Sequence, residues 1–357
     1  IKEEGPMSFK EFMEMGLYYP ELGYYNAKSS RIGPAGDFYT SPCLSSIFGT
    51  LIGKQLEEMW RKLGSRPFTV VEYGAGTGQL CHDILDHLKH NEELYSNLRY
   101  CIIERSPVMK EIEQSHLLEK VEWHNSIKTV HGLNGCVLSN ELVDNGAVHQ
   151  VIQGKELMEV FIDHNNKNFV EVLQPAPEGL KNYLKELQID LPEGYRAEIN
   201  LQATDWIKEA ATVLQRGYVM TIDYGYLSAE LYKPCKSCGT LVSYTRHTVN
   251  DGFYEHIGGQ DITAHVNFSA LIHWGAKSGL RELGFTAQGP FLLAMGFREC
   301  LQQEFSGETD VILAAQKASR LSHTLLIDMG SKFKILLQGK NVNNDRLSGF
   351  QLTKKQV

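Results

Sequence analysis

The sequence predicts an α/β fold with one mainly parallel sheet of about seven strands, helices on both faces, and an inserted lobe. Two observations predict this fold. From Phe68 onward, short apolar runs rich in β-branched residues alternate with helical patterns. Residues 149–180 and 226–280 interrupt that alternation. The chain has 357 residues, 42% hydrophobic and 22% charged, and this ordinary globular composition excludes collagen, low-complexity disorder and a bare coiled coil.

Charge and cysteine usage exclude further classes. The sequence contains no apolar run of about 18 residues, so we expect no membrane-spanning helix. A formal net charge of −8 argues against a nucleic-acid partner, because such a surface needs excess positive charge. The seven cysteines are scattered, and several lie in apolar runs, which favours reduced thiols. The opening Ile1-Lys2-Glu3-Glu4 does not have the pattern of a secretory signal, and a removed targeting segment stays open.

The first part of the chain predicts a helical cap followed by the strands of the sheet. Helical patterns at Ser8 to Leu17 and Ile47 to Leu63 flank a Gly/Pro-rich loop from Ile32 to Pro42. A helix is expected from Gln79 to His90, because its apolar residues recur at helical spacing. The predicted strands are Phe68 to Tyr73, Leu98 to Glu104, Val121 to His124, Cys136 to Leu138 and Tyr218 to Asp223.

The inserted segments predict a second, β-containing lobe. In residues 149–180, strands are linked by Asn165-Asn166, and residues 226–280 give no clear pattern. Two more strands of the main sheet are expected at Phe285 to Met295 and Phe333 to Gln338. The expected division is a cap with its loop at 1–66, a core at 67–148, 215–225 and 281–345, and a substrate lobe at 149–214 and 226–280.

A glycine-rich loop closes the first strand and precedes a helix. It reads Glu72-Tyr73-Gly74-Ala75-Gly76-Thr77-Gly78, so an acid stands two residues before the first glycine. Glycines let the backbone approach a ligand closely, and the helix start offers unpaired N–H groups. The dinucleotide pattern G-x-G-x-x-G fails, because its last position falls on Gln79. The spacing is that of class I S-adenosylmethionine methyltransferases, in which the acid faces the amino-acid end of the cofactor.

A second acid follows the next strand. Glu104 ends the run Tyr100 to Glu104, where a carboxylate can accept hydrogen bonds from both ribose hydroxyls. Asn125 and Ser126 follow the third strand and are expected at the adenine edge. A tight strand-to-helix turn without ligand is the alternative for Gly74 to Gly78. The presence of both Glu72 and Glu104 favours the cofactor site.

Acidic residues also follow the fourth strand. Asn140, Glu141 and Asp144 stand at its carboxyl end, the edge that lines the ligand crevice in open α/β sheets. Methyl transfer requires the protein to orient the acceptor and remove its proton. Two carboxylates suit a guanidinium acceptor, because they match its fork of donors. The alternative is a helix N-terminus capped by Asn140 with Glu141 in its first turn.

Other polar clusters give weaker signals. Cys235-Lys236-Ser237-Cys238 could be redox-active or half of a zinc site, and free thiols in a loop are favoured. His247, Asp261 and His265 could suggest a metal, but hydrogen-bonded packing is favoured, so no metal ligands are predicted. Tyr18-Tyr19 and Tyr24-Tyr25 are interpreted as core between lobes rather than a substrate platform.

Taken together, these motifs resemble the MidA family, which includes mitochondrial arginine methyltransferases that assist complex I assembly. The matching motifs span nearly the whole chain and are Pro20 to Tyr25, Gly36-Asp37-Phe38-Tyr39-Thr40-Ser41-Pro42, Asn140-Glu141 with Asp144, Ile222 to Gly225, Gly239 to Leu241, Tyr244 with His247, and Gln260 to Val266. Two positions depart from the family pattern: Asn145-Gly146-Ala147 replaces A-x-P, and Cys43 replaces a glutamate.

The resemblance implies a Rossmann-like class I methyltransferase that methylates an arginine of a partner protein. S-adenosylmethionine is then held by Glu72, Gly74, Ala75, Gly76, Gly78, Glu104, Asn125, Ser126, Asn140, Thr40 and Ser41. Glu141, with Asp144 and Asp37, orients and deprotonates the acceptor. The alternatives are a small-molecule O- or N-methyltransferase and a non-catalytic, cofactor-binding assembly factor. The expected location is the cytoplasm for a bacterial source and the mitochondrial matrix for a eukaryotic one.

Overall fold

The computed structural model describes residues 1, 5–27, 40–117, 119–165, 168–245, 248–250 and 252–352. The chain divides into two compact units. Unit 1 comprises Ile1–Phe38, Val143–Ile207 and Gly225–Trp274, and unit 2 comprises Tyr39–Leu142, Lys208–Tyr224 and Gly275–Val357. The expected cap at 1–66 is therefore divided, with residues 1–38 grouped with the inserted lobe and residues 39–66 with the core. In the described part of the chain, no helix is long and apolar enough to cross a membrane.

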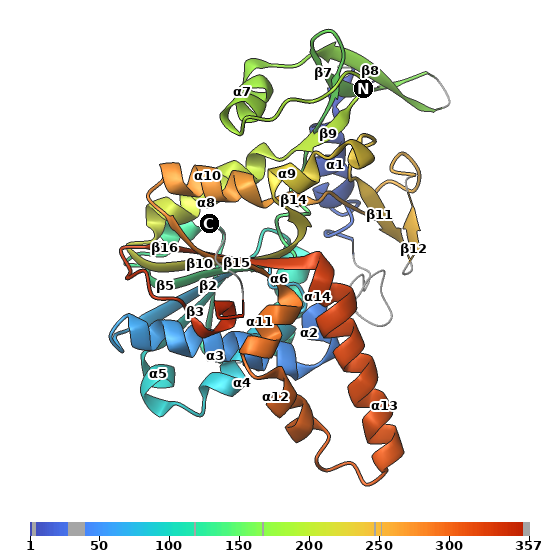
Figure 1. Ribbon diagram of the computed structural model, residues 1–357. Helices are drawn as coiled ribbons and strands as arrows, with labels where there is room; N and C mark the ends of the chain where they lie inside the picture. The colour runs from blue at the N-terminus through green and yellow to red at the C-terminus, as the bar shows by residue number, and fades with distance from the viewer. Residues whose placement is uncertain are drawn as a thin grey trace. The chain divides into compact units, whose positions relative to one another are not determined.

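Unit 2 contains the main sheet, in the order β15-β16-β10-β5-β2-β3-β4 (Figure 1). The strands β2, β3, β4, β5 and β10 run parallel, whereas β16 is antiparallel to both of its neighbours. This order, with one reversed strand near one edge, is the class I methyltransferase arrangement, and the predicted fold class is confirmed. The strands are β2 Phe68–Tyr73, β3 Leu98–Ile103, β4 Val121–His124, β5 Asn134–Asn140, β10 Arg216–Tyr226, β15 Arg281–Ala287 and β16 Phe333–Lys340.

Helices cover this sheet, and α3 and α4 pack together on one face (Figure 1). Two glycines of α3 permit close contact, since a Cβ at Gly49 would lie 2.4 Å from Cβ of Asp83 in α4. A Cβ at Gly53 would lie 2.8 Å from the ring of His87. The unit 2 helices are α2 Ser41–Leu44, α3 Ser46–Lys62, α4 Gln79–Leu88, α5 Glu92–Asn97, α6 Pro107–His116, η1 Ile127–Thr129, α11 Gln288–Ala294, α12 Phe297–Glu304, α13 Val311–Ser322, η3 His323–Asp328, α14 Met329–Lys332 and η4 Ser348–Phe350.

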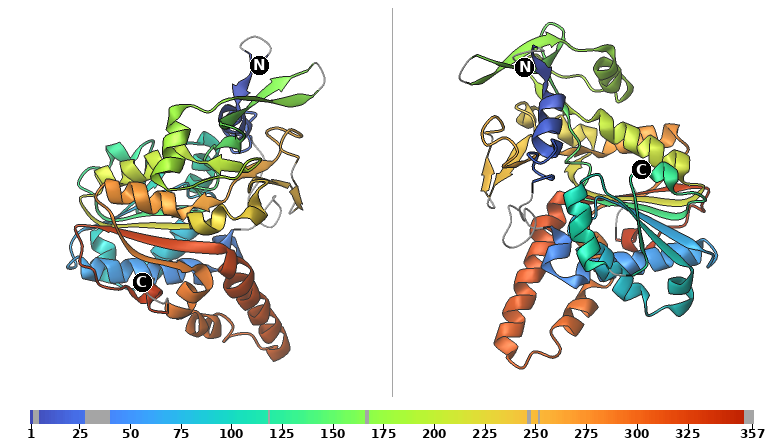
Figure 2. Two further views of the ribbon diagram at one scale, coloured as in Figure 1. Left: turned by 45° about the horizontal axis from the view of Figure 1, so that its top comes forward. Right: turned by 180° about the vertical axis from the view of Figure 1, so that it is seen from behind.

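Unit 1 contains antiparallel β-structure, and Figure 2 shows its β7–β8 hairpin from two sides. The sheet order is β1-β7-β6-β9, with β8 also paired to β7, and β12-β11-β13 form a smaller sheet. The prediction of strands in residues 149–180 is confirmed. The strands are β1 Met7–Ser8, β6 His149–Gln153, β7 Leu157–His164, β8 Phe169–Pro175, β9 Arg196–Ile199, β11 Val242–Thr245, β12 Thr248–Asn250, β13 Asp261–Thr263 and β14 Val266–Asn267.

The first helix of unit 1 begins at a capping box. Ser8 Oγ accepts a hydrogen bond from the Glu11 N–H, and the Glu11 carboxylate accepts one from the Ser8 N–H at 2.9 Å. These two bonds satisfy backbone donors that have no partner within the helix. This first helix is α1 Phe9–Tyr18, and the other helices of the unit, two of which continue into unit 2, are α7 Glu178–Glu186, α8 Leu201–Val213, α9 Ser228–Leu231, η2 Pro234–Lys236 and α10 Phe268–Lys277.

One predicted strand is wrong in its second half. The segment Phe285 to Met295 was expected to be extended, but β15 ends at Ala287 and α11 begins at Gln288. Pro290 explains the difference, because proline has no N–H for a strand ladder and is tolerated in the first turn of a helix.

Candidate active site

The glycine loop joins β2 to α4 in backbone conformations that favour glycine. Gly74, Gly76 and Gly78 have φ angles of 62°, 61° and 78°. A Cβ at Gly74 would lie 2.9 Å from Leu142 Cδ1, and one at Gly78 would lie 3.0 Å from Leu117 Cδ1. No side chain caps α4, so its first N–H groups face the loop, ready for an acceptor.

Glu72 lies at the end of β2 as a buried acid. It is 1% exposed, and the Tyr100 hydroxyl donates a hydrogen bond to its carboxylate at 2.6 Å. Burial raises the pKa of Glu72 to about 7, and the Tyr100 hydrogen bond partly opposes that rise. A buried carboxylate with one neutral donor favours a cationic ligand group, such as the amino group of the cofactor's amino-acid end.

Glu104 follows β3 immediately and is also buried. The Ser106 N–H donates to Glu104 Oε1 at 2.6 Å, and Ser106 in turn caps α6. Burial raises the pKa of Glu104, whereas the Ser106 hydrogen bond lowers it. Glu72 and Glu104 thus end neighbouring parallel strands, since Glu72 pairs with Ile102 of β3.

The two predicted adenine residues follow β4. Asn125 is exposed, and Ser126 caps the short helix η1, with its Oγ accepting from the Lys128 N–H at 3.3 Å. Nothing in these contacts tests the adenine assignment, which stays a prediction.

Glu141 occupies a left-handed backbone position at the end of β5. Its φ is 52°, and its N–H donates to the Ile222 carbonyl of β10 at 2.9 Å. Its Oε1 accepts from the Ser41 N–H at 3.3 Å and from Asn140 Nδ2 at 3.2 Å. The alternative reading, a helix N-terminus capped by Asn140, is wrong, because Asn140 is the last residue of β5 and an irregular segment follows it.

The segment beginning at Thr40 lies against this edge of the sheet. Ser41 is 1% exposed, and Nε2 of the buried Gln288 lies 3.3 Å from its Oγ. Thr40 Oγ1 lies 3.2 Å from Cys43 Sγ. The Ser41 N–H bond to Glu141 therefore joins the T-S-P motif to the N-E motif. Asp37, Phe38 and Tyr39 lie outside the described residues.

Asp144 belongs to unit 1, whereas Glu141 belongs to unit 2. Asp144 is 5% exposed, and its carbonyl accepts from the Ala264 N–H at 3.1 Å. Burial raises the pKa of Tyr25, and the negative charges of Asp261 and, to a smaller extent, Asp144 add to that rise. Tyr25 donates to Asp261 at 3.1 Å. The joint action of Glu141 and Asp144 stays a prediction.

The sequence reasoning missed several buried polar residues of unit 2. Asp223 of β10 is fully buried and accepts from the Leu142 N–H at 3.2 Å, which fixes the segment after Glu141. The sequence feature that could have revealed Asp223 is an acidic residue inside an otherwise apolar strand. Tyr100 and Gln288 gave no comparable signal, because a tyrosine in a strand and a glutamine near a proline are common.

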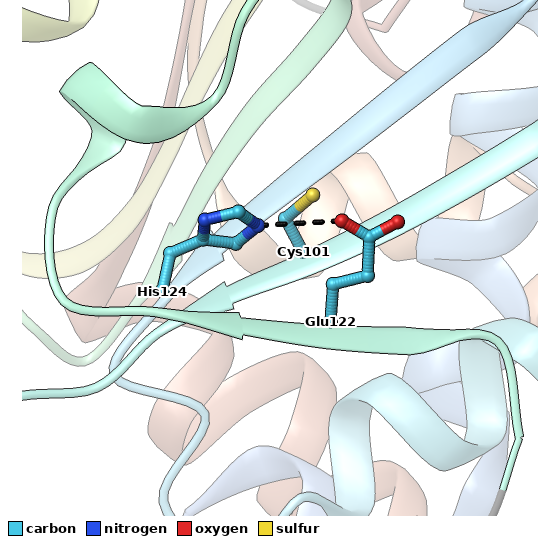
Figure 3. Close-up of side chains that lie close together, drawn as sticks. All are labelled: Cys101, Glu122 and His124. Carbon is cyan, nitrogen blue, oxygen red and sulfur yellow. Dashed lines mark hydrogen bonds and ion pairs between the residues drawn. The ribbon is translucent and has the colours of Figure 1, made fainter.

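One further polar group lies on β3 and β4 (Figure 3). Ligand atoms of Cys101, Glu122 and His124 lie within 4.8 Å of one another, which makes them the one potential metal-ligand trio found in the described part of the chain. Arg99 donates to both carboxylate oxygens of Glu122, and His124 Nδ1 lies 2.8 Å from Thr129 Oγ1. Burial raises the pKa of Cys101 to about 11. These contacts describe an ion pair between Arg99 and Glu122 with a protonated thiol nearby, and they do not favour a bound metal ion.

The remaining sequence signals have ordinary surroundings. All seven cysteines are free, with Cys235 and Cys238 exposed. The rings of Tyr18 and Tyr25 stack with their centroids 5.3 Å apart, and Tyr24 is fully buried, as expected for core residues. For Tyr19 the core interpretation is wrong, because its side chain is 47% exposed. His247 lies outside the described residues, and burial lowers the pKa of His265 to about 4.

Comparison with known proteins identifies the family. A family model described as "Putative S-adenosyl-L-methionine-dependent methyltransferase" matches residues 51–286. The match covers more than half of the chain. The chain belongs to this methyltransferase family.

Relatives of this methyltransferase are similar over most of their lengths. It is 28% identical to "Protein arginine methyltransferase NDUFAF7 homolog, mitochondrial" of Drosophila melanogaster, over 94% of this chain and 82% of that one. It is 26% identical to the protein of Rattus norvegicus named "Protein arginine methyltransferase NDUFAF7, mitochondrial", over 90% and 81%.

A solved structure is similar across the whole fold. A "likely methyl transferase" from Burkholderia thailandensis, bound to S-adenosyl-homocysteine, has a TM-score of 0.85 and 28% identity, covering 98% of this chain and 92% of that one. The methyl donor of this methyltransferase is therefore S-adenosylmethionine.

The residues of the glycine-loop region fit that donor. Glycines stand where a Cβ would collide with Leu142 or Leu117, and α4 begins without a cap. Two buried carboxyls end adjacent strands, and Asn140 Oδ1 is buried without a hydrogen-bond donor in the described part of the protein. Polar groups of this kind are costly to bury unless a ligand satisfies them.

Proposed function

We propose that this methyltransferase modifies an arginine side chain of a partner protein, and that Glu141 is its acceptor-side carboxylate. The observation that carries the proposal is the carboxylate of Glu141, which Ser41 and Asn140 hold at the carboxyl edge of the parallel sheet. The names of the mitochondrial relatives support an arginine acceptor.

The cofactor side of the proposal assigns roles to the residues of the glycine loop and its acids. Glu72 binds the amino group of S-adenosylmethionine, the backbone of Gly74, Ala75, Gly76 and Gly78 faces it closely, and Glu104 accepts from the ribose hydroxyls. The other predicted contacts are made by Asn125, Ser126, Asn140, Thr40 and Ser41. When bound, the cofactor supplies an electrophilic methyl group.

Glu141 acts on the acceptor. A carboxylate can accept two parallel N–H bonds from a guanidinium, which fixes the attacking nitrogen. The same carboxylate can remove the proton that this nitrogen must lose. In the proposal, Asp144 and Asp37 assist in orienting the acceptor. The protein works in the mitochondrial matrix if its source is eukaryotic, in an assembly role for respiratory complex I, and in the cytoplasm if its source is bacterial.

The test is transfer of a radiolabelled methyl group from S-adenosylmethionine into an extract of the source organism. Glu141→Gln should keep S-adenosylhomocysteine affinity and lower transfer by roughly 100-fold or more, because the amide cannot take a proton. Glu93→Gln, at an exposed position in α5, is the matched control and should transfer at the native rate. Amino-acid analysis of the labelled protein should yield methylarginine.

Three outcomes would contradict the proposal. Methyl transfer by Glu141→Gln at the native rate would show that Glu141 does not act on the acceptor. Label confined to small molecules indicates a small-molecule O- or N-methyltransferase. Binding of S-adenosylhomocysteine without any transfer, with the extract supplemented by purified complex I subunits, indicates a non-catalytic assembly factor.

A further inference from the structure

A third buried carboxyl group lies beside Glu104. Glu113, in α6, has no exposed surface, and Trp123 of β4 donates from Nε1 to its Oε2 at 2.8 Å. Its Oε1 is buried and receives no N–H from the described residues. The charge of Glu104 acts on this buried carboxyl group, and the two side chains are close enough to share a hydrogen bond if one of them is protonated.

This pair also lies beside the glycine loop. A Cβ placed at Gly78 would be 3.7 Å from the Glu113 Cα, so α6 passes directly behind the last glycine. Glu113 therefore lies next to the loop with its backbone and next to Glu104 with its side chain.

Two carboxyl groups can share a hydrogen bond only if one of them carries a proton. The charged groups that face Glu113 are Glu104 after β3 and Glu72 in β2, and Cys81 of α4 lies near enough to sense its charge. Burial, followed by the charge of Glu104, raises the pKa of Glu113 to about 9. Arg105 acts on Glu104 and favours its ionised form. The proton therefore belongs on Glu113, and the negative charge on Glu104.

We propose that Glu113 is a positioning residue of the cofactor site, which donates its carboxyl proton to Glu104 and fixes that carboxylate for the ribose hydroxyls. The Ser106 N–H, the Arg105 N–H and the Glu113 O–H then hold the Glu104 carboxylate through three of its roughly four acceptor directions. The direction that remains faces no donor of this set and is available to a ribose hydroxyl. This inference rests on the proposed role of Glu104 in binding ribose.

The test is calorimetric titration of S-adenosylhomocysteine into native protein, Glu113→Gln and Glu113→Ala, from neutral pH to above the pKa of Glu113. Glutamine keeps both bonds, because its amide N–H donates to Glu104 and its oxygen accepts from Trp123. At neutral pH, Glu113→Gln should bind within about twofold of native, and Glu113→Ala about tenfold more weakly, the loss of about one net hydrogen bond to a charged group.

The pH profile separates positioning from packing. Above about pH 9, Glu113 ionises in the native protein and can no longer donate a proton to Glu104. The dissociation constant of S-adenosylhomocysteine from the native protein should therefore rise relative to that from Glu113→Gln. The ratio of the two constants cancels titration of the ligand's own amino group, which affects both proteins equally. Circular dichroism at each pH checks that the native protein and Glu113→Gln remain folded. If Glu113→Ala does not fold, the ratio of the native and Glu113→Gln dissociation constants is the deciding measurement.

Two results would overturn the inference: a ratio that stays constant with pH, or Glu113→Gln binding as weakly as Glu113→Ala. Glu104→Gln in the same titration tests the proposed function separately. If Glu104→Gln binds like native protein, the ribose role of Glu104 fails. If Glu104→Gln loses affinity while the Glu113 variants do not, the inference about Glu113 fails alone.

Discussion

The proposed cofactor side and the proposed acceptor side of the sheet edge in unit 2 differ in how deeply their carboxyl groups are buried. On the cofactor side, Glu72 and Glu104 are at most 8% exposed, and each accepts a short hydrogen bond from the chain. On the proposed acceptor side, Glu141 is partly exposed, and its Oε1 accepts longer hydrogen bonds, at 3.3 Å from Ser41 and at 3.2 Å from Asn140. The carboxyl groups of the proposed cofactor side are thus fixed by burial, whereas the carboxylate of the proposed acceptor side keeps part of its surface open.

The largest expected effect that separates the two sides comes from Glu72→Gln. Removing the negative charge should weaken S-adenosylhomocysteine binding by roughly 10- to 100-fold, since a charge-assisted bond to the ligand amino group is lost. Glu141→Gln should leave this affinity unchanged. Calorimetry on both variants checks the contrast, and equal losses in both would show that the sides are not separable.

Glu72→Gln should also change stability in a pH-dependent way. The folded-state pKa of Glu72, about 7, lies above the ordinary value of 4.5, so native protein loses stability as the pH rises between these values. Above that window the variant should be more stable by on the order of 1–3 kcal/mol, and below it the difference should vanish. Urea unfolding of ligand-free protein at several pH values measures this. A gain that does not depend on pH would contradict the assigned cause.

Gly74→Ala should have a smaller effect, confined to the cofactor side. The left-handed backbone position costs alanine about 1–2 kcal/mol, and the new Cβ would press on Leu142. We expect binding to weaken about tenfold, because the loop must shift away from the ligand. Gly132→Ala is the matched control, with a φ of 67° and open space around its Cβ. Gly132→Ala should lose a similar amount of stability and bind S-adenosylhomocysteine with native affinity. If Gly132→Ala also bound more weakly, the weaker binding of Gly74→Ala could not be attributed to the glycine loop.

The smallest effect is expected from a substitution of Glu122, which belongs to neither the proposed cofactor side nor the proposed acceptor side. Its ion pair with Arg99 is exposed, so Glu122→Gln should change the free energy of unfolding by less than about 0.5 kcal/mol. Binding and methyl transfer should stay native. Thermal unfolding and calorimetry check this, and a clear change in affinity would extend the cofactor side to the group shown in Figure 3.

Sequence reasoning recovered the parts of the molecule that depend on local pattern. The alternation of apolar runs and helical spacing predicted β2 to β5, α3 and α4 within a few residues, and the glycine loop lies where β2 meets α4. The residual errors have physical causes. Pro290 ends the expected strand, and the backbone at Glu141 turns left-handed where a helix had been an alternative.

Other features required the fold to bring distant residues together. Glu113 is one acid among several in α6, and only the tertiary structure sets it against Glu104 and Trp123. The division of the cap between the two units is likewise a property of three-dimensional contacts. Neither the position of Glu113 nor the division of the cap can be predicted from a pattern in the sequence.

The left-handed backbone of Glu141 has a consequence for evolution and engineering. A non-glycine residue at a φ of 52° costs on the order of 1 kcal/mol, so random mutation followed by selection for heat resistance should enrich glycine or asparagine at this position. Such clones would be more stable and would lose the proposed acceptor carboxylate. Position 141 is therefore a place where selection for stability and selection for the proposed methyl transfer act in opposite directions.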